Sequence, residues 1–196
     1  MEQIKGRLNG VRPRALLAFG AMVCERMYPN YVAFERQQTW GNSSVLRWAL
    51  DAVWTMLLND RLEVAVVRQH LASCEEAIPS TDDFPGTSAS MALDSATAIC
   101  DLLDGVETGP LEKVAEICTL AIDSVDRHIQ FEDLSSRAAI TPADELFIAE
   151  HPLMQAELQR QEDQLAKVVG AERFDRDTLT RLKVEAQQAK LFELTS

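Results

Sequence analysis

The chain has 196 residues, of which 46% are apolar, and this length suits one packed domain over residues 1–196 better than two. The net charge is −12, and residues 74–133 hold two basic residues against fourteen acidic ones. Nucleic-acid binding needs a concentrated basic face, so that class is disfavoured, whereas an acidic face that docks on a basic protein partner is not.

The start of the chain imitates a secretory leader, because basic residues precede the apolar stretch at 15–24. Cleavage needs small residues just before the cut, but Met22 and Val23 precede Cys24, and the apolar spacing is that of an amphipathic helix. No apolar run approaches the roughly 18 to 20 residues that span a bilayer. We therefore expect a cytoplasmic protein without membrane association.

The four cysteines also favour a reducing compartment. They form no C-x-x-C pair, and each lies within or beside an apolar run, as buried, reduced thiols do. Their positions are Cys24, Cys74, Cys100 and Cys118.

Helical periodicity covers nearly the whole chain and predicts an all-α bundle of about seven to eight helices. The first helix is predicted from about Arg14 to Tyr28. Pro29 then breaks or kinks it, because proline lacks the backbone donor and clashes with the preceding turn. A second helix begins near Ser43, and its low charge predicts that it is the central, most buried helix.

Further helices are predicted at about 61–77, 88–106, 110–130, 142–151, 153–169 and 176–192. The last two are polar apart from narrow apolar seams, such as Leu179, Leu182 and Ala186. These seams indicate packing on the core of the chain or on a second copy, and the second alternative makes the protein a homodimer.

Known catalytic and nucleotide-binding motifs do not occur in the sequence. H-E-x-x-H, G-x-G-x-x-G, G-x-S-x-G and the phosphate-binding loop are all missing, so the corresponding enzymes have no support. The histidines are scattered, and surface or capping roles are favoured over metal or catalytic ones. They are His70, His128 and His151.

Acidic residues after the third predicted helix are the remaining candidates for a metal site. Their carboxylates would suit a hard cation if the chain folded back on itself. Turn, capping and solvated roles are favoured instead, so no metal or cofactor is predicted. The residues are Glu75, Glu76, Asp82, Asp83 and Asp94.

Two segments resemble the signatures of a known family. The first reads Cys-Glu-Arg-Met-Tyr-Pro-Asn-Tyr at 24–31, with Phe34 after it. The second reads Glu-Glu-Ala-Ile-Pro-Ser at 75–80, with Asp-Asp-Phe at 82–84. Both are similar to a YjaG-like bacterial family, domain of unknown function 416. The resemblance implies an all-α cytoplasmic protein without agreed catalytic residues, and an association with histidine-kinase signalling.

The two signature segments are expected to meet in a structural clasp. Arg26 would pair with Asp82 or Asp83, and a tyrosine would cover the contact. Pro29 would redirect the chain so that Tyr31 and Phe34 rejoin the core. The full candidate set for the clasp, or for a binding site at the same place, is Glu25, Arg26, Tyr28, Tyr31, Glu75, Glu76, Asp82, Asp83 and Asp94.

Two functions stay open at this point. A non-enzymatic interaction or regulatory protein would use its acidic middle helices or its last helices to dock an unidentified protein partner. The alternative is a small-ligand or metal-dependent enzyme with a carboxylate-lined pocket between residues 24–34 and 75–94. The first function is favoured, because perturbed charges mark functional sites only in some proteins.

Overall fold

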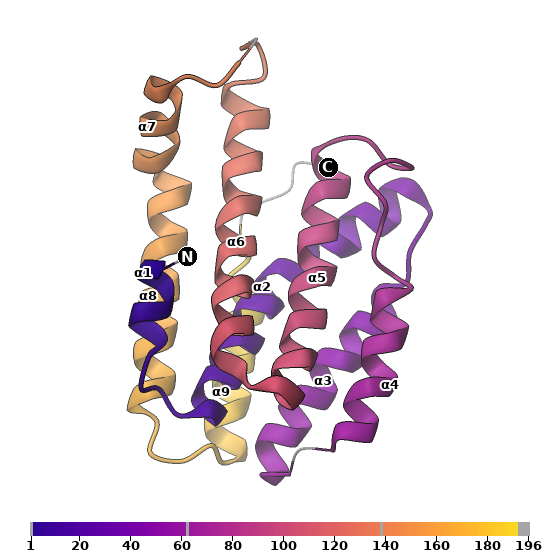
Figure 1. The fold of residues 1–196 in the computed structure, drawn as a ribbon, viewed down its shortest axis with the longest axis vertical. Helices are drawn as coiled ribbons and strands as arrows, with labels where there is room; N and C mark the ends of the chain where they lie inside the picture. Colours follow the sequence, from indigo (N-terminus) through magenta and orange to yellow (C-terminus); the bar gives the residue numbers. More distant parts are fainter. Residues whose placement is uncertain (1, 62, 138, 192–196) are drawn as a thin grey trace.

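The computed structural model describes residues 2–61, 63–137 and 139–191, and all regular structure in these ranges is α-helical (Figure 1). The helices are α1 (Glu2–Leu8), α2 (Pro13–Gln38), α3 (Ser43–Asn59), α4 (Val64–Glu75), α5 (Thr87–Thr108), α6 (Pro110–Asp133), α7 (Pro142–Glu150), α8 (Pro152–Gly170) and α9 (Arg176–Gln188). This confirms the predicted all-α class. It adds α1, which the periodicity did not predict.

The most buried helix is α2, so the prediction that α3 has this position is wrong. Every side chain from residue 15 to residue 27 is buried, whereas Trp48 on α3 is 61% exposed. Five other helices pack against α2, namely α3, α5, α6, α8 and α9. Low charge was a poor guide to burial, because the charged Glu25 and Arg26 of α2 are paired inside the core.

Pro29 lies inside α2, and the helix continues to Gln38, so of the two predicted alternatives, a break or a kink, the break is wrong. An interior proline removes one backbone hydrogen bond and costs about 3 kcal/mol. Apolar side chains on both sides offset this cost, since Met27, Tyr31 and Phe34 are all fully buried. The prediction that Tyr31 and Phe34 belong to the core is confirmed.

Short connections with favourable local chemistry join the helices. Gly109 alone separates α5 from α6, and its φ of 108° favours glycine. Thr141 and Asp144 form a capping box at the start of α7, where the sequence predicted a helix. The Nδ1 atom of His151 accepts a hydrogen bond from the Leu153 amide, 3.2 Å away, which confirms a capping role for this histidine.

The outer helices pack on the core of their own chain. Figure 1 shows the α5–α6 hairpin between α4 on one side and the α7–α8 column on the other, and α8 packs against both α6 and α2. The seam of Leu179, Leu182 and Ala186 on α9 is buried, and this helix packs on α2 and α3. Within the described residues, every helix is too short or too polar to cross a bilayer.

Candidate functional site

The two signature segments meet through aromatic side chains. The Tyr31 hydroxyl donates to the carbonyl of Ala77 at 2.6 Å, and it accepts a hydrogen bond from the Asn42 amide at 3.2 Å. The rings of Phe34 and Phe84 lie edge to face with centroids 5.4 Å apart. The segments at 24–34 and 75–84 are therefore in contact, as expected, but not through the expected ion pair.

Arg26 does not pair with Asp82 or Asp83, so the predicted clasp is wrong. Its side chain is fully buried, its Nη1 donates to the Glu157 carboxylate, and its Nε donates to Gln164 Oε1 at 3.1 Å. Both partners lie on α8, whereas Asp82 and Asp83 are exposed. A buried guanidinium needs partners that are also buried, and Glu157 and Gln164 of α8 meet this need because both are buried.

Glu25 links α2 to two other helices. Its carboxylate accepts two hydrogen bonds from the Arg47 guanidinium, each 2.7 Å long, and one from Trp54 Nε1 at 2.9 Å. Gln187 on α9 donates to the same carboxylate at 3.2 Å. The bidentate Arg47 pair and the indole donor make Glu25 a well-partnered structural residue.

The acidic candidates do not converge, so the predicted carboxylate lining is wrong, although a cavity does lie between residues 24–34 and 75–94. Glu75 and Glu76 are exposed, as are the two loop aspartates. Asp94 is buried, and its Oδ2 accepts from Ser124 Oγ at 3.0 Å and from Arg127. Burial raises the pKa of Asp94, and the Arg127 charge opposes this shift. Across the described residues, no three His, Cys, Asp or Glu side chains gather as a metal site would require.

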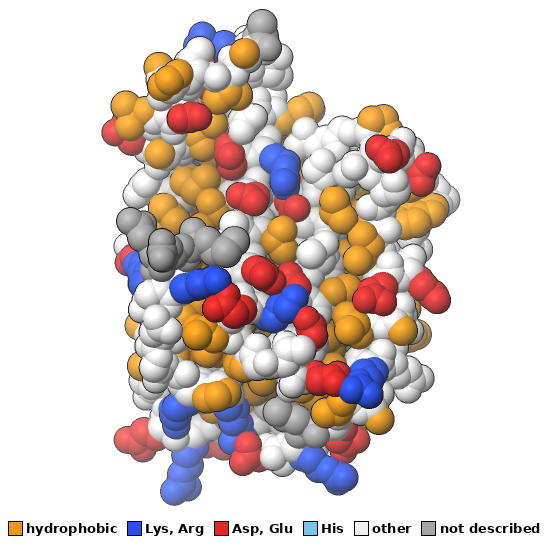
Figure 2. All heavy atoms as spheres, viewed as in Figure 1, with side chains coloured by type: hydrophobic (Ala, Val, Ile, Leu, Met, Phe, Trp, Pro, Cys, Tyr) orange, Lys and Arg blue, Asp and Glu red, His pale blue; other side chains and the backbone are white. Residues whose placement is uncertain are grey.

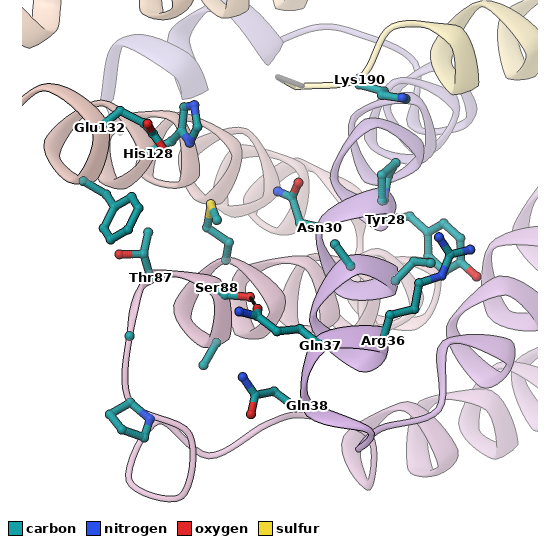
Figure 3. Close-up of a pocket in the computed structure, with 18 residues that line it drawn as sticks. Tyr28, Asn30, Arg36, Gln37, Gln38, Thr87, Ser88, His128, Glu132 and Lys190 are labelled. Carbon is teal, nitrogen blue, oxygen red and sulfur yellow. Dashed lines mark hydrogen bonds between the residues drawn. The ribbon is translucent and has the colours of Figure 1, made fainter. Parts of the chain in front are cut away.

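A cavity of about 950 Å³ lies between α2, α5 and α6, beside the contact of the two signature segments (Figure 3). Residues from 28 to 38 of α2 form one wall, and residues 85–91 with the start of α5 form another. The last turns of α6 contribute a third wall with His128, Phe131 and Glu132, and Lys190 also lines the cavity. Its volume is in the range of small-molecule binding sites.

Asn30 is the residue that distinguishes this cavity. Its side chain is only 4% exposed and lines the cavity, yet its Nδ2 has no hydrogen-bond partner among the described residues. Figure 3 shows it reaching from α2 into the space between the walls. Buried polar groups are hydrogen-bonded in the great majority of cases, so an orphaned donor on a cavity wall indicates a missing acceptor.

Two other buried side-chain nitrogens also lack a partner among the described residues, but they do not indicate a missing acceptor in the cavity. Nη2 of Arg26 and Nε2 of Gln164 are also unpaired, but each belongs to a side chain that already takes part in a buried hydrogen bond. Neither residue lines the cavity. Asn30 therefore combines a buried donor without a partner among the described residues with a place on the cavity wall.

Sequence reasoning missed Asn30, although a signal was present. Met27, Asn30 and Phe34 are three and four residues apart, which places the amide on the apolar face of α2. An asparagine at a core-facing position costs free energy unless it has a partner. Among the predicted site residues, only Tyr28 lines the cavity, and its hydroxyl donates to the Ser43 carbonyl at 3.1 Å.

The surroundings of His128 on the α6 wall favour its neutral form. Burial lowers its pKa, and the neighbouring carboxylates of Glu132 and Asp133 oppose this shift. On the opposite wall, Ser88 Oγ donates to Gln37 Oε1 at 2.9 Å and ties the start of α5 to α2. The cavity thus combines apolar surface with neutral polar groups and with the charged Arg36, Glu132 and Lys190.

The described residues define an all-α protein with a partly polar cavity. Comparison with known proteins gives the family: the chain belongs to DUF416, described as a protein of unknown function, which matches residues 3–192. This confirms the resemblance of the two signature segments. YjaG of Escherichia coli K12 is 35% identical over 120 residues, and YjaG of Salmonella typhimurium LT2 is 33% identical over 120 residues. The matched region spans 61% of this chain and 61% of each of these relatives.

A solved structure supports the fold along nearly the whole chain. The crystal structure of a DUF416 family protein from Shewanella baltica OS155 superposes with a TM-score of 0.85 and covers 98% of both chains. The sequence identity is 22%, so this likeness concerns the arrangement of the helices.

Proposed function

We propose that this protein binds a small organic molecule in the cavity between α2, α5 and α6. The observation that carries the proposal is the Asn30 amide, which is 4% exposed and has an Nδ2 without a partner among the described residues. A ligand that brings a hydrogen-bond acceptor to this nitrogen would remove the desolvation cost of the buried donor, about 1 to 3 kcal/mol.

Binding is proposed rather than chemistry because of the kind of group that lacks a partner. A carboxamide neither gains nor loses a proton near neutral pH, so it orients a ligand but does not act as an acid or a base. The apolar groups beside it, Met91 and Ala33 among them, suit the body of such a ligand.

A fragment screen by ligand-observed NMR tests the proposal. We expect fragments with a hydrogen-bond acceptor to bind the wild-type protein and to lose at least tenfold in affinity to the Asn30→Leu variant. Asn59→Leu is the matched control, since Asn59 is exposed at the end of α3. The Asn30→Ala variant repeats the test without added bulk. Fragment affinities unchanged in both Asn30 variants would refute the proposal.

A homodimer is a second proposal, and exposed apolar side chains of α7 favour it. Leu146 is 59% exposed and Phe147 is 44% exposed, and Figure 2 shows hydrophobic side chains gathered at this end of the molecule. Large exposed apolar groups that lie together are typical of protein contacts. Light scattering should give twice the 21.9 kDa chain mass, and Leu146→Ser with Phe147→Ser should halve it. A monomer mass at all concentrations would count decisively against this proposal.

A further inference from the structure

The whole carboxamide of Asn30 lacks a hydrogen-bond partner among the described residues, and not only its nitrogen. Nδ2 is a buried donor without an acceptor, and no hydrogen bond of the described residues reaches Oδ1. Figure 3 shows both end atoms of this side chain turned away from the α2 ribbon. A primary carboxamide carries a donor and an acceptor side by side. Asn30 therefore presents a complete hydrogen-bonding edge at the cavity wall, and a ligand with one acceptor would satisfy only half of it.

Two hydroxyls that link α5 to α2 do not complete this edge, because they have other partners. Ser88 Oγ donates to Gln37 Oε1 at 2.9 Å. Ser95 Oγ donates to the carbonyls of Met27 and Met91, at 2.9 and 2.7 Å. A serine hydroxyl has a single proton, so the donor of each hydroxyl is already used. The carboxamide is thus left to a molecule from outside the described chain.

Apolar side chains from three helices limit the shape of that molecule. Ala33 of α2, Met91 of α5 and Phe131 of α6 all line the cavity. Such a lining suits the faces of a flat ring, whose hydrogen-bonding atoms lie on its edge. The volume of about 950 Å³ is large enough for a ligand with two fused rings.

We infer that the ligand is a cyclic amide, whose ring N–H and carbonyl lie side by side on one edge. The ring N–H donates to Oδ1 of Asn30, and the carbonyl accepts from Nδ2, so both ends of the carboxamide gain a partner. Asparagine recognises the neighbouring donor and acceptor of adenine by the same two-bond geometry. The inference rests on the proposed function and adds the chemical class of the ligand.

Two fragments of the same shape test the inference. Carbostyril is a cyclic amide of two fused rings, and coumarin keeps its carbonyl but has a ring oxygen in place of the ring N–H. Each fragment is titrated into the wild-type protein by ligand-observed NMR at pH 7. We expect carbostyril to bind at least about tenfold more tightly than coumarin, because coumarin leaves Oδ1 of Asn30 without a donor.

Variants at Asn30 show whether this preference comes from the carboxamide. Asn30→Leu removes the donor and the acceptor together, so the preference for carbostyril should fall to less than about threefold. Asn30→Ala repeats the measurement without added bulk. The matched control Asn59→Leu changes an exposed asparagine and should keep the full preference.

The outcomes distinguish this inference from the proposed function. If the wild type binds both fragments equally and both weaken at least tenfold in Asn30→Leu, the inference is overturned and the proposed function stands. If both Asn30 variants keep the full preference for carbostyril, its N–H is recognised elsewhere and the inference is overturned. If neither fragment binds the wild type, the inference is again overturned, and the fragment screen alone decides the proposed function.

Discussion

Two neighbouring regions of α2 contain buried polar side chains, and the regions differ in whether those side chains have partners within the chain. Glu25 and Arg26 are 2% and 0% exposed, and their charges meet Arg47 on α3 and Glu157 on α8. One turn later Asn30 is buried to a similar extent and lines the cavity, but its Nδ2 has no hydrogen-bond partner among the described residues. In the first region both charges are paired within the chain, and these pairs hold helices together. The second lacks an acceptor, as a binding site does before its ligand arrives.

The largest expected effect comes from breaking the paired region at Arg26. Arg26→Met leaves the fully buried Glu157 carboxylate with only the more distant guanidinium of Arg160, whose Nη1 lies 3.5 Å from Oε2. Removing one partner of a buried pair costs about 3 to 5 kcal/mol of the free energy of unfolding. Urea melts of the wild type and the variant measure this loss.

A double mutant and a surface variant sharpen this prediction. Arg26→Met combined with Glu157→Met should recover part of the loss, because both buried charges are then gone. Asp82→Asn should change the free energy of unfolding by less than about 0.5 kcal/mol, because this carboxylate is exposed. If Asp82→Asn strongly lowered the free energy of unfolding, and if this loss were not additive with that of Arg26→Met, the data would support the clasp between Arg26 and Asp82 that the geometry excludes.

Glu25 should give the next largest effect. Glu25→Ala removes the acceptor of Arg47 and of Trp54 Nε1, and the indole is left buried without a partner. We expect a loss of about 1 to 3 kcal/mol, less than for Arg26, because Arg47 also pairs with Asp51 at 3.0 Å. Melts followed by tryptophan fluorescence report on stability. A Glu25→Ala variant as stable as the wild type would mean that this carboxylate is not structural.

The two regions also differ in what the sequence could predict. Periodicity and capping residues predicted most helices, since Pro110, Thr141 and the apolar seam of α9 act locally. The partner of Arg26 is 131 residues away and could not be predicted, because nothing nearby distinguishes Glu157 from the other carboxylates. The spacing of Asn30 from Met27 and Phe34 indicated a buried amide. The cavity beside it could not be predicted, because its walls come from three helices that meet only in the folded chain.

Removing the unpartnered amide should have a small effect of the opposite sign. Asn30→Leu replaces a buried donor that lacks an acceptor by an apolar group of comparable size. Without ligand, we expect the free energy of unfolding to stay constant or to rise by about 1 kcal/mol, because the desolvation cost of the amide disappears. Urea melts beside the exposed Asn59→Leu control check this. A loss above about 2 kcal/mol would show that Asn30 is a structural residue like Arg26, and the contrast between the two regions would fail.

The smallest expected effect is a dependence on pH at the cavity wall. Burial lowers the pKa of His128 below 6.5, so the unfolded chain binds a proton more readily than the folded protein does. The free energy of unfolding should therefore be constant above pH 6.5 and should fall as the pH drops from 6.5 toward the folded pKa. The slope should be well below the roughly 1.4 kcal/mol per pH unit of one full proton, because His128 is only partly buried. Urea melts between pH 7.5 and 5.5, compared for the wild type and His128→Gln, isolate this slope because the other titrating groups are shared. If the two curves run parallel, or if the wild type gains stability relative to His128→Gln on acidification, then the α6 wall does not favour a neutral imidazole.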